Sequence, residues 1–241
     1  MPTKTYAMIA REGHGLLLLV AVCAALLHAF LGFYAAIPAW GLLGLLFYQF
    51  RDPTQTPPSL PLAIVSPIHG RITASGPTRD PWLKRDSESV AVTTGIFDIR
   101  SIYAPIEGKI VEQWTTIPDP EPGEGCPKHS NAFHIRTDER DDIVLVITRG
   151  EWGGNVSIAY NPGERIGQGR RIGYANFGCS ARLYLPAGSQ LAVAAGDKVA
   201  AGSSVVAMLV HLTRMSLPRD ADAATTNPAA SVIDRSVTDE A

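Results

Sequence analysis

A long apolar run dominates the N-terminal part of the chain. No Asp, Glu, Lys or Arg occurs between residues 15 and 50. A single membrane span needs only about 20 apolar residues, and the apolar core of a secretory signal peptide has about 7 to 15. The run is therefore too long for a signal peptide and predicts a membrane anchor. A buried helix pair of a soluble protein is the alternative, but the remaining chain offers little apolar surface to cover it.

Pro38 and the glycines around it predict a break inside this run. The break divides it into residues 16–33 and 39–50, which suggests a hairpin of two short helices. Since a hairpin returns both ends to the same side of the bilayer, the flanking cations favour the cytoplasmic side for the soluble part. These cations are Lys4, Arg11 and Arg51. The second segment is short for a complete span, so one or two spans stay open.

Beyond residue 50 the pattern changes to short alternating runs. Four prolines between residues 53 and 61 predict an extended linker. Runs rich in β-branched residues, separated by Gly and Pro turns, then predict a domain that is mainly β. The expected strands are residues 63–65, 90–94, 109–114, 132–136, 143–148, 156–160, 181–185 and 204–210.

Five segments follow from this pattern. Residues 1–14 form an N-terminal segment, 15–50 the helical anchor, 51–61 the linker, and 62–215 the β domain. Residues 216–241 are rich in Ala, Asp, Thr and Ser and lack an apolar period, which predicts a disordered tail.

Two short motifs each occur twice in the β domain. Residues 67–72 (PIHGRI) match residues 105–110 (PIEGKI), and residues 163–169 (GERIGQG) match residues 196–202 (GDKVAAG). The glycines permit tight turns, and the alternating charged and apolar positions fit strands with one buried face. We therefore expect a barrel-sandwich-like domain with a duplicated β unit. Biotinyl and lipoyl carriers have similar turns, but the MKM-like motif that holds the modified lysine of such carriers does not occur here.

Composition excludes several classes of function. The chain has 21 Lys+Arg against 23 Asp+Glu and a net charge of -2, whereas binding to a nucleic acid backbone calls for a basic face. Its three cysteines, Cys23, Cys126 and Cys179, form neither a CxxC motif nor an even disulfide framework. The six histidines show no HExxH spacing, so no metal site is predicted.

Several segments together resemble one family of membrane enzymes. They are residues 50–53 (FRDP), 65–72 (VSPIHGRI, against VSPADGRV), 97–108 (FDIRSIYAPIEG, against FDVHVNRAPVDG), 138–141 (DERD, against NERN) and 169–186 (GRRIGYANFGCSARLYLP, against GERFGLIRFGSRVDVYLP). Their order and spacing agree over about residues 11–208. On these blocks the chain is identified as a divergent member of the short bacterial form of the phosphatidylserine decarboxylases, which is far more specific than any single motif.

The resemblance implies a carboxy-lyase of phospholipid biosynthesis at the bacterial inner membrane, with its soluble domain on the cytoplasmic face. In this family the Gly-Ser bond of the FGS motif undergoes autocatalytic cleavage, and the serine becomes an N-terminal pyruvoyl group. The pyruvoyl carbonyl binds the amine of phosphatidylserine and accepts charge as carbon dioxide leaves, which yields phosphatidylethanolamine. The implied partners are thus phosphatidylserine and the phospholipid membrane, and the sequence leaves open whether the chain forms a homo-oligomer.

Three substitutions fall on the family's catalytic positions. Cys179 stands at the cleaved serine, where its thiol could attack the Gly178 carbonyl and still serve as the pyruvoyl precursor. His69 replaces the aspartate of SPADG, and Arg100 replaces the histidine of FDVH. Imidazole can act as a general base, but guanidinium stays protonated and cannot. The alternative interpretation makes His69 a turn residue and Cys179 a small buried side chain.

Three other residues are candidates for the same site. Ser203 lies in a GSS sequence that resembles the cleavage motif of longer relatives, although it follows the last repeat and is better explained as a turn. Arg140, in the DERD segment, is a candidate for binding the substrate phosphate, and Arg51 could do the same from beside the membrane. The alternative for both is a surface charge, which is the preferred interpretation of Arg51.

Three hypotheses of function remain from the sequence. The leading one is a phosphatidylserine decarboxylase that processes itself at Gly178/Cys179. The second is a membrane-anchored homologue without catalysis that binds lipid or a partner protein, which the substitutions at positions 69, 100 and 179 favour. The third, a thiol hydrolase or acyltransferase using Cys179 and His69, rests on residue type alone.

Overall fold

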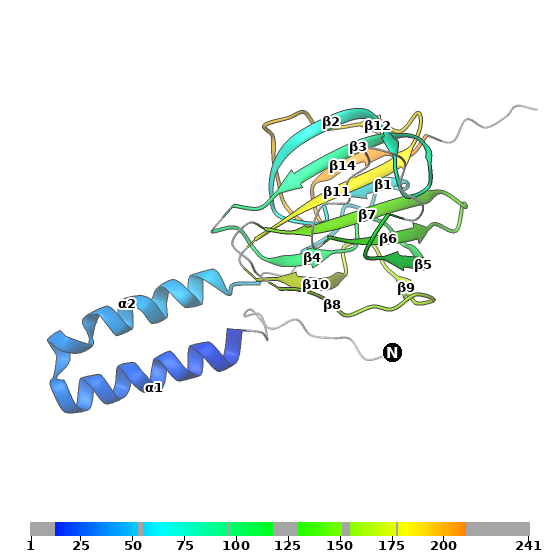
Figure 1. Cartoon of the computed structure of the whole chain (residues 1–241). Helices are drawn as coiled ribbons and strands as arrows, with labels where there is room; N and C mark the ends of the chain where they lie inside the picture. Colours follow the sequence, from blue (N-terminus) through cyan, green and yellow to red (C-terminus); the bar gives the residue numbers. More distant parts are fainter. Residues whose placement is uncertain are drawn as a thin grey trace, which may run out of the picture. The chain divides into compact units, whose positions relative to one another are not determined.

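The computed structural model describes residues 13–52, 55–95, 97–117, 130–150, 155–176 and 178–210. In these residues two antiparallel helices are followed by strands that form three sheets (Figure 1). A mainly β fold with a duplicated unit and a preceding helical hairpin is therefore confirmed, and the sheets do not close into a barrel.

The hairpin turns at a glycine and not at the proline. Helix α1 covers His14–Leu31, helix α2 covers Phe33–Gln49, and Gly32 joins them with φ +87°. The expected break at Pro38 is wrong, because a glycine adopts the positive φ of the sharp turn without strain. Pro38 lies inside α2, where its missing N–H costs one helix hydrogen bond.

Both helices leave most of their apolar side chains uncovered. Helix α1 has 18 residues with a mean hydropathy of 2.3, so by length and composition it could cross a membrane. Helix α2 is equally apolar in character but has 17 residues. Ala24 and Ala36 are fully buried, which fits small side chains at a close helix contact. The exposed leucines and aromatic residues form a surface that suits lipid better than water.

Three sheets make up the β part. The strands are β1 (Ala63–Val65), β2 (Gly70–Asp80), β3 (Arg85–Thr93), β4 (Ser101–Tyr103), β5 (Gly108–Trp114), β6 (Ser130–Arg136), β7 (Asp142–Arg149), β8 (Val156–Ile158), β9 (Arg165–Ile166), β10 (Arg171–Ala175), β11 (Cys179–Pro186), β12 (Gln190–Leu191), β13 (Lys198–Val199) and β14 (Val205–Met208). The large sheet has the order β13-β2-β3-β11-β7-β6-β5-β9, and the small sheets have the orders β1-β14-β12 and β4-β10-β8. Isoleucines, leucines and valines from all three sheets share the main core.

The strand order reveals how the duplication is built. The order of the large sheet reads the same from both ends when β2 is exchanged with β5, β3 with β6, β11 with β7 and β13 with β9. Exchange of β1 with β4, β14 with β10 and β12 with β8 likewise converts one small sheet into the other. One copy therefore comprises β4 to β10, and it is inserted between β3 and β11 of the other copy (Figure 1).

Hydrogen bonds between the copies follow this symmetry. The Val65 N–H donates to the Pro105 carbonyl at 2.9 Å, and the Tyr103 N–H donates to the Pro67 carbonyl at 2.8 Å. The repeated glycines Gly70 and Gly108 are also equivalent. A Cβ on Gly70 would lie 2.1 Å from the Thr93 carbonyl oxygen, and a Cβ on Gly108 would lie 2.5 Å from the Arg136 carbonyl oxygen. Glycine is thus required where neighbouring strands approach closely.

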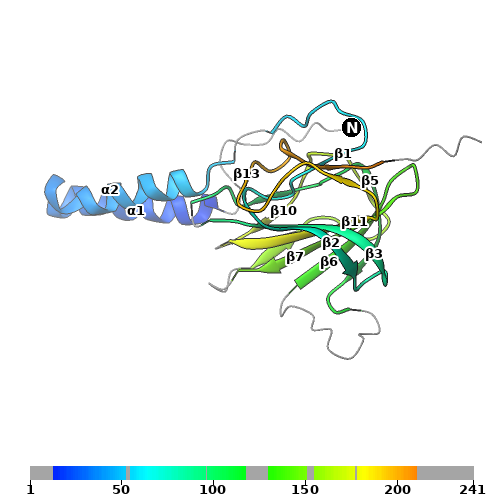
Figure 2. The ribbon, with the colours of Figure 1, turned by 90° about the horizontal axis from the view of Figure 1, so that it is seen from above.

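The residues after the hairpin contact the β part. Asp52 is 3% exposed, accepts a hydrogen bond from the Tyr103 hydroxyl at 2.9 Å and lies 3.4 Å from the Arg171 guanidinium. Helices α1 and α2 lie against each other (Figure 2). Leu17 and Phe50, at the foot of the hairpin, pack against Tyr174 of β10. The foot of the hairpin is thereby tied to strands β4 and β10.

We expect Asp52→Ala to destabilise the protein. It leaves the largely buried Arg171 guanidinium and the Tyr103 hydroxyl without this carboxylate, a loss of about 3 kcal/mol, which corresponds to about 6–12 °C in Tm. Thermal unfolding of the full chain in detergent measures this shift. Asp86→Ala, which removes an exposed carboxylate from β3, is the control and should leave Tm nearly unchanged. Equal Tm values for both variants would contradict the structural role of Asp52.

Candidate active site

The peptide bond between Gly178 and Cys179 lies where the central strand β11 begins. Strand β11 pairs with β3 on one side and with β7 on the other. Gly178 has φ +86°, a backbone conformation that favours glycine. The Cys179 side chain is 3% exposed and belongs to the main core. The sheet thus holds the candidate scissile bond at the edge of the core.

Four hydrogen bonds fix this peptide. The Gly178 carbonyl accepts a hydrogen bond from the Gly150 N–H at 3.2 Å. The Cys179 N–H donates to the Thr94 hydroxyl oxygen at 2.8 Å, and that hydroxyl donates to the Cys179 carbonyl at 2.8 Å. The Thr94 N–H donates to the same carbonyl at 3.1 Å. Both sides of the bond are therefore oriented, and its carbonyl is polarised by a backbone donor.

The Cys179 thiol is protonated in this position. Burial raises its pKa to about 12, and the hydrogen bond with Thr94 opposes this increase only in part. A nucleophilic thiolate at neutral pH needs a nearby cation or a helix N-terminus that lowers the pKa. The site therefore differs from that of a thiol hydrolase with a standing thiolate, and Cys179 needs a base to react.

His69 lies in the connection between β1 and β2, and the next residue, Gly70, approaches Thr94. The half-buried imidazole is 3.5 Å from the Gln55 side-chain nitrogen. Burial lowers its pKa below 6.5, which the nearby Asp98 carboxylate opposes and the Arg51 guanidinium assists. Among the described residues no hydrogen bond joins this ring to Cys179.

The backbone after His69 nevertheless reaches the Cys179 surroundings. A Cβ on Gly70 would lie 3.1 Å from the Thr94 Cα, and Thr94 is bonded to Cys179. The imidazole is therefore neutral at pH 7, and it lies in the connection before β2, a strand that is separated from β11 by β3.

Arg100 occupies a different part of the fold. Its side chain is 9% exposed and interacts with Tyr174, the residue that packs on the hairpin foot. Burial lowers the pKa of Arg100, but a guanidinium keeps its charge in proteins. The Ala175 N–H donates to the Arg100 carbonyl at 2.9 Å, and Ala175 precedes Gly178 by three residues in the sequence.

The structure places Arg140 far from this peptide. Arg140 has φ +72° in the turn before β7, whereas Cys179 pairs with Arg149 at the other end of that strand, roughly 25 Å away. Contact of Arg140 with substrate stays a prediction. Ser203 lies in a turn, where its N–H donates to the Ala200 carbonyl. The Arg170 N–H makes the equivalent hydrogen bond to the Gly167 carbonyl in the other copy.

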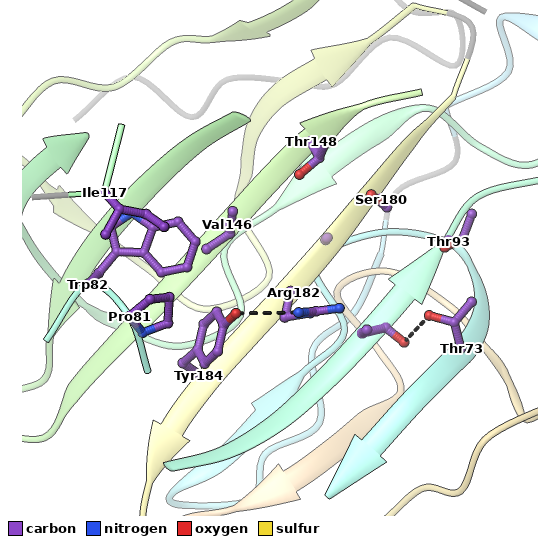
Figure 3. A pocket seen from close by; sticks show the side chains of 12 residues that line it. Thr73, Pro81, Trp82, Thr93, Ile117, Val146, Thr148, Ser180, Arg182 and Tyr184 are labelled. Atoms are coloured by element: carbon purple, nitrogen blue, oxygen red, sulfur yellow. Dashed lines mark hydrogen bonds between the residues drawn. The ribbon is translucent and has the colours of Figure 1, made fainter. Parts of the chain in front are cut away.

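A cavity of about 290 Å³ lies on the opposite face of the large sheet (Figure 3). Because side chains alternate along a strand, Ser180, Arg182 and Tyr184 point to this face while Cys179 points into the core. The Arg182 guanidinium donates to the Tyr184 hydroxyl at 3.5 Å. Cys179 and Ser180, neighbours in sequence, thus face separate environments, and Ser180 cannot take the place of Cys179 in the core.

The profile of the phosphatidylserine decarboxylase family matches residues 42–207, which include every strand up to β13 and most of β14. The chain belongs to the phosphatidylserine decarboxylase family. Two curated relatives are each called phosphatidylserine decarboxylase proenzyme. That of Nitrosomonas eutropha is 34% identical over 86% of this chain and 99% of its own length, and that of Aromatoleum aromaticum is 32% identical over 85% and 97%. No solved structure matches.

The position of Cys179 fits the pyruvoyl group implied by this decarboxylase family. Its β-carbon carries a heteroatom that can leave, and the preceding carbonyl is already held by a backbone donor. Pairing of β11 with β3 and β7 would keep a new N-terminus at residue 179 in place.

Sequence reasoning missed Thr94, Gly150 and Asp98 around this candidate site. Thr94 and Cys179 are 85 residues apart in the chain, and no motif links them. Gly150 contributes only its backbone N–H, which carries no signal in the residue type. Asp98 lies in the FDIR segment, yet its influence on the pKa of His69 depends on tertiary proximity.

We expect Cys179 of the uncut chain to resist alkylation. With a pKa of about 12, only about one thiol in a thousand is ionised at pH 9, and the side chain is buried. In a chain carrying Cys23→Ser and Cys126→Ser, mass spectrometry should show modification of uncut Cys179 by iodoacetamide only after denaturation. Labelling of native protein at the rate of a free cysteine would contradict this environment.

Proposed function

We propose that the chain is a membrane-anchored phosphatidylserine decarboxylase that activates itself by cleavage between Gly178 and Cys179. The observation that carries the proposal is the oriented peptide at the start of β11, with the Gly150 N–H on its carbonyl and a β-heteroatom on the next residue. The relatives' name, proenzyme, supports a processed precursor.

Cleavage begins as an isomerisation of this peptide. The Cys179 sulfur attacks the Gly178 carbonyl carbon, the new S–C bond replaces the C–N bond, and the thiol proton ends on the Cys179 nitrogen. Negative charge develops on the Gly178 oxygen, where the Gly150 N–H donates. Removal of the Cys179 α-proton then breaks its Cβ–S bond, with Gly178 leaving as a thiocarboxylate. Water releases ammonia from the residue that remains, which leaves the pyruvoyl group.

A base is required because the thiol is protonated. We assign this role to His69, whose lowered pKa keeps the imidazole neutral at pH 7. Its place beside the Thr94 segment supports the assignment. Asp98 lies close enough to affect its pKa, and a carboxylate stabilises the imidazolium that forms when the proton is taken up.

The cations near the hairpin foot are suited to an anionic headgroup. Phosphatidylserine carries a phosphate and a carboxylate, and guanidinium matches both geometries. Arg100 lies beside Tyr174 at this foot, and Arg51 follows α2 directly. When formed, the pyruvoyl group supplies an electron sink for loss of carbon dioxide. Arg100 thus binds the anionic headgroup and does not act as a base. The reaction takes place at the cytoplasmic face of a bacterial inner membrane.

A homologue without catalysis is the second candidate. The replacement of the family's residues at positions 69, 100 and 179 favours it, as does the absence of a hydrogen bond between His69 and Cys179 in the described part of the chain. Such a protein would keep the fold and the membrane anchor while its backbone stays intact.

Self-cleavage leaves a signature that needs no substrate. Intact-mass analysis of purified protein should show two chains, the smaller one beginning at former residue 179 with a ketone that a carbonyl reagent labels. Cys179→Ala should abolish the cut, Cys179→Ser should retain it through an oxygen nucleophile, and Ser203→Ala should leave it unchanged. A single chain of full mass after long incubation with phosphatidylserine membranes sinks the enzyme hypothesis and selects the homologue without catalysis.

The pH dependence of cleavage tests the base. Since burial lowers the pKa of His69 below 6.5, the rate constant should stay level through neutral pH and fall only in more acidic solution, where the imidazole takes up a proton. His69→Gln should slow cleavage and remove this acidic limb. A rate that instead rises about tenfold per pH unit between pH 6 and 9 indicates direct ionisation of the thiol, which excludes His69 as the base.

A further inference from the structure

The duplication places a second peptide in the same backbone setting as the candidate scissile bond. Exchange of β11 with β7 superimposes Gly178 and Cys179 on Arg140 and Asp141, and exchange of β3 with β6 superimposes Thr94 on Thr137. Gly178 and Arg140 both have positive φ values, +86° and +72°.

The hydrogen bonds of the two settings agree. The Cys179 N–H donates to the Thr94 hydroxyl at 2.8 Å, and the Asp141 N–H donates to the Thr137 hydroxyl at 3.0 Å. The threonine N–H donates to the carbonyl of the paired residue at 3.1 Å for Thr94 and 3.0 Å for Thr137. The backbone arrangement is therefore a property of the repeated fold and is not unique to the decarboxylase site.

Three features distinguish the Cys179 setting. The Thr94 hydroxyl donates to the Cys179 carbonyl at 2.8 Å, whereas the Thr137 hydroxyl donates to the Asp141 carboxylate at 3.5 Å. Only Cys179 carries a thiol on the β-carbon, and the Gly178 carbonyl has the Gly150 N–H as its donor. Among the described residues no hydrogen bond to the Arg140 carbonyl is found. The hydrogen bonds between the threonine and the peptide thus support chemistry in one copy and only structure in the other.

We propose that Thr94 is a positioning residue for self-cleavage, which rests on the proposed function. Its hydroxyl fixes the N–H and the carbonyl of Cys179, while Gly150 fixes the carbonyl of Gly178. With both neighbouring groups held, the peptide plane cannot rotate, and the Cys179 sulfur approaches the carbonyl carbon from one defined side. Thr94 therefore acts on the rate of the first step by holding the peptide and the neighbouring thiol, and not by accepting the thiol proton.

The test compares the two threonines in the full chain. Thr94→Val removes the hydroxyl and should slow self-cleavage by about 10- to 100-fold, measured as the rate of appearance of the two chains by intact mass. Thr94→Ser keeps the hydroxyl and should cleave near the wild-type rate. Thr137→Val removes the equivalent hydrogen bond to the Asp141 N–H in the other copy and should leave the rate unchanged.

A merely structural role predicts a different pattern. It predicts similar decreases in Tm and similar changes in cleavage for Thr94→Val and Thr137→Val. Thr94→Ala replaces Thr94→Val if the branched apolar side chain prevents folding. If folded Thr94→Val or Thr94→Ala cleaves at the wild-type rate, or if Thr137→Val slows cleavage equally, Thr94 is not a positioning residue. The proposed function is unaffected by either result. A wild-type chain that stays uncut overturns the proposed function, and this role with it.

Discussion

The pairing of β11 with β7 joins the two copies at the centre of the large sheet. Six residue pairs connect these strands, and each strand also continues into the sheet of its own copy. The buried faces of both contribute Leu183 and Leu145 to the main core. The hydrogen bonds of the candidate site depend on this register, because Gly150 and Gly178 meet only when Arg149 is opposite Cys179.

The same burial that stabilises the core restrains Cys179. A thiol in an apolar environment loses the hydration that an anion requires, so its pKa rises. The reactivity of a buried, protonated thiol therefore depends on how the thiol and the peptide are oriented. The backbone donors orient the peptide without ionising the thiol in advance, and a neutral imidazole lies in the connection before β2. The buried thiol of the precursor therefore reacts only slowly with other electrophiles.

The sequence predicted the elements more accurately than the contacts. The repeated PIxG[RK]I motifs indicated duplication because each needs glycine at the same close approach. The order of the strands was not predictable, since nothing local specifies that one copy lies inside the other. The hairpin turns at Gly32 and not at Pro38, because glycine adopts the positive φ of the turn while an apolar helix tolerates a proline. Cys179 and His69 were found as residues, but the partner of Cys179, Thr94, is distant in the chain.

The insertion of one copy into the other determines what a break at residue 178 leaves behind. The inner copy ends with β10, and the outer copy resumes with β11, so the break falls on the seam between them. The downstream piece would carry the last four strands of the outer copy, and the upstream piece would carry its first three. Each piece then lacks what the other holds, as in a split protein whose fragments fold only together. Separation of the two pieces would require breaking the pairing of β11 with both β3 and β7. The cleaved molecule would therefore stay associated without a disulfide or linker across the break.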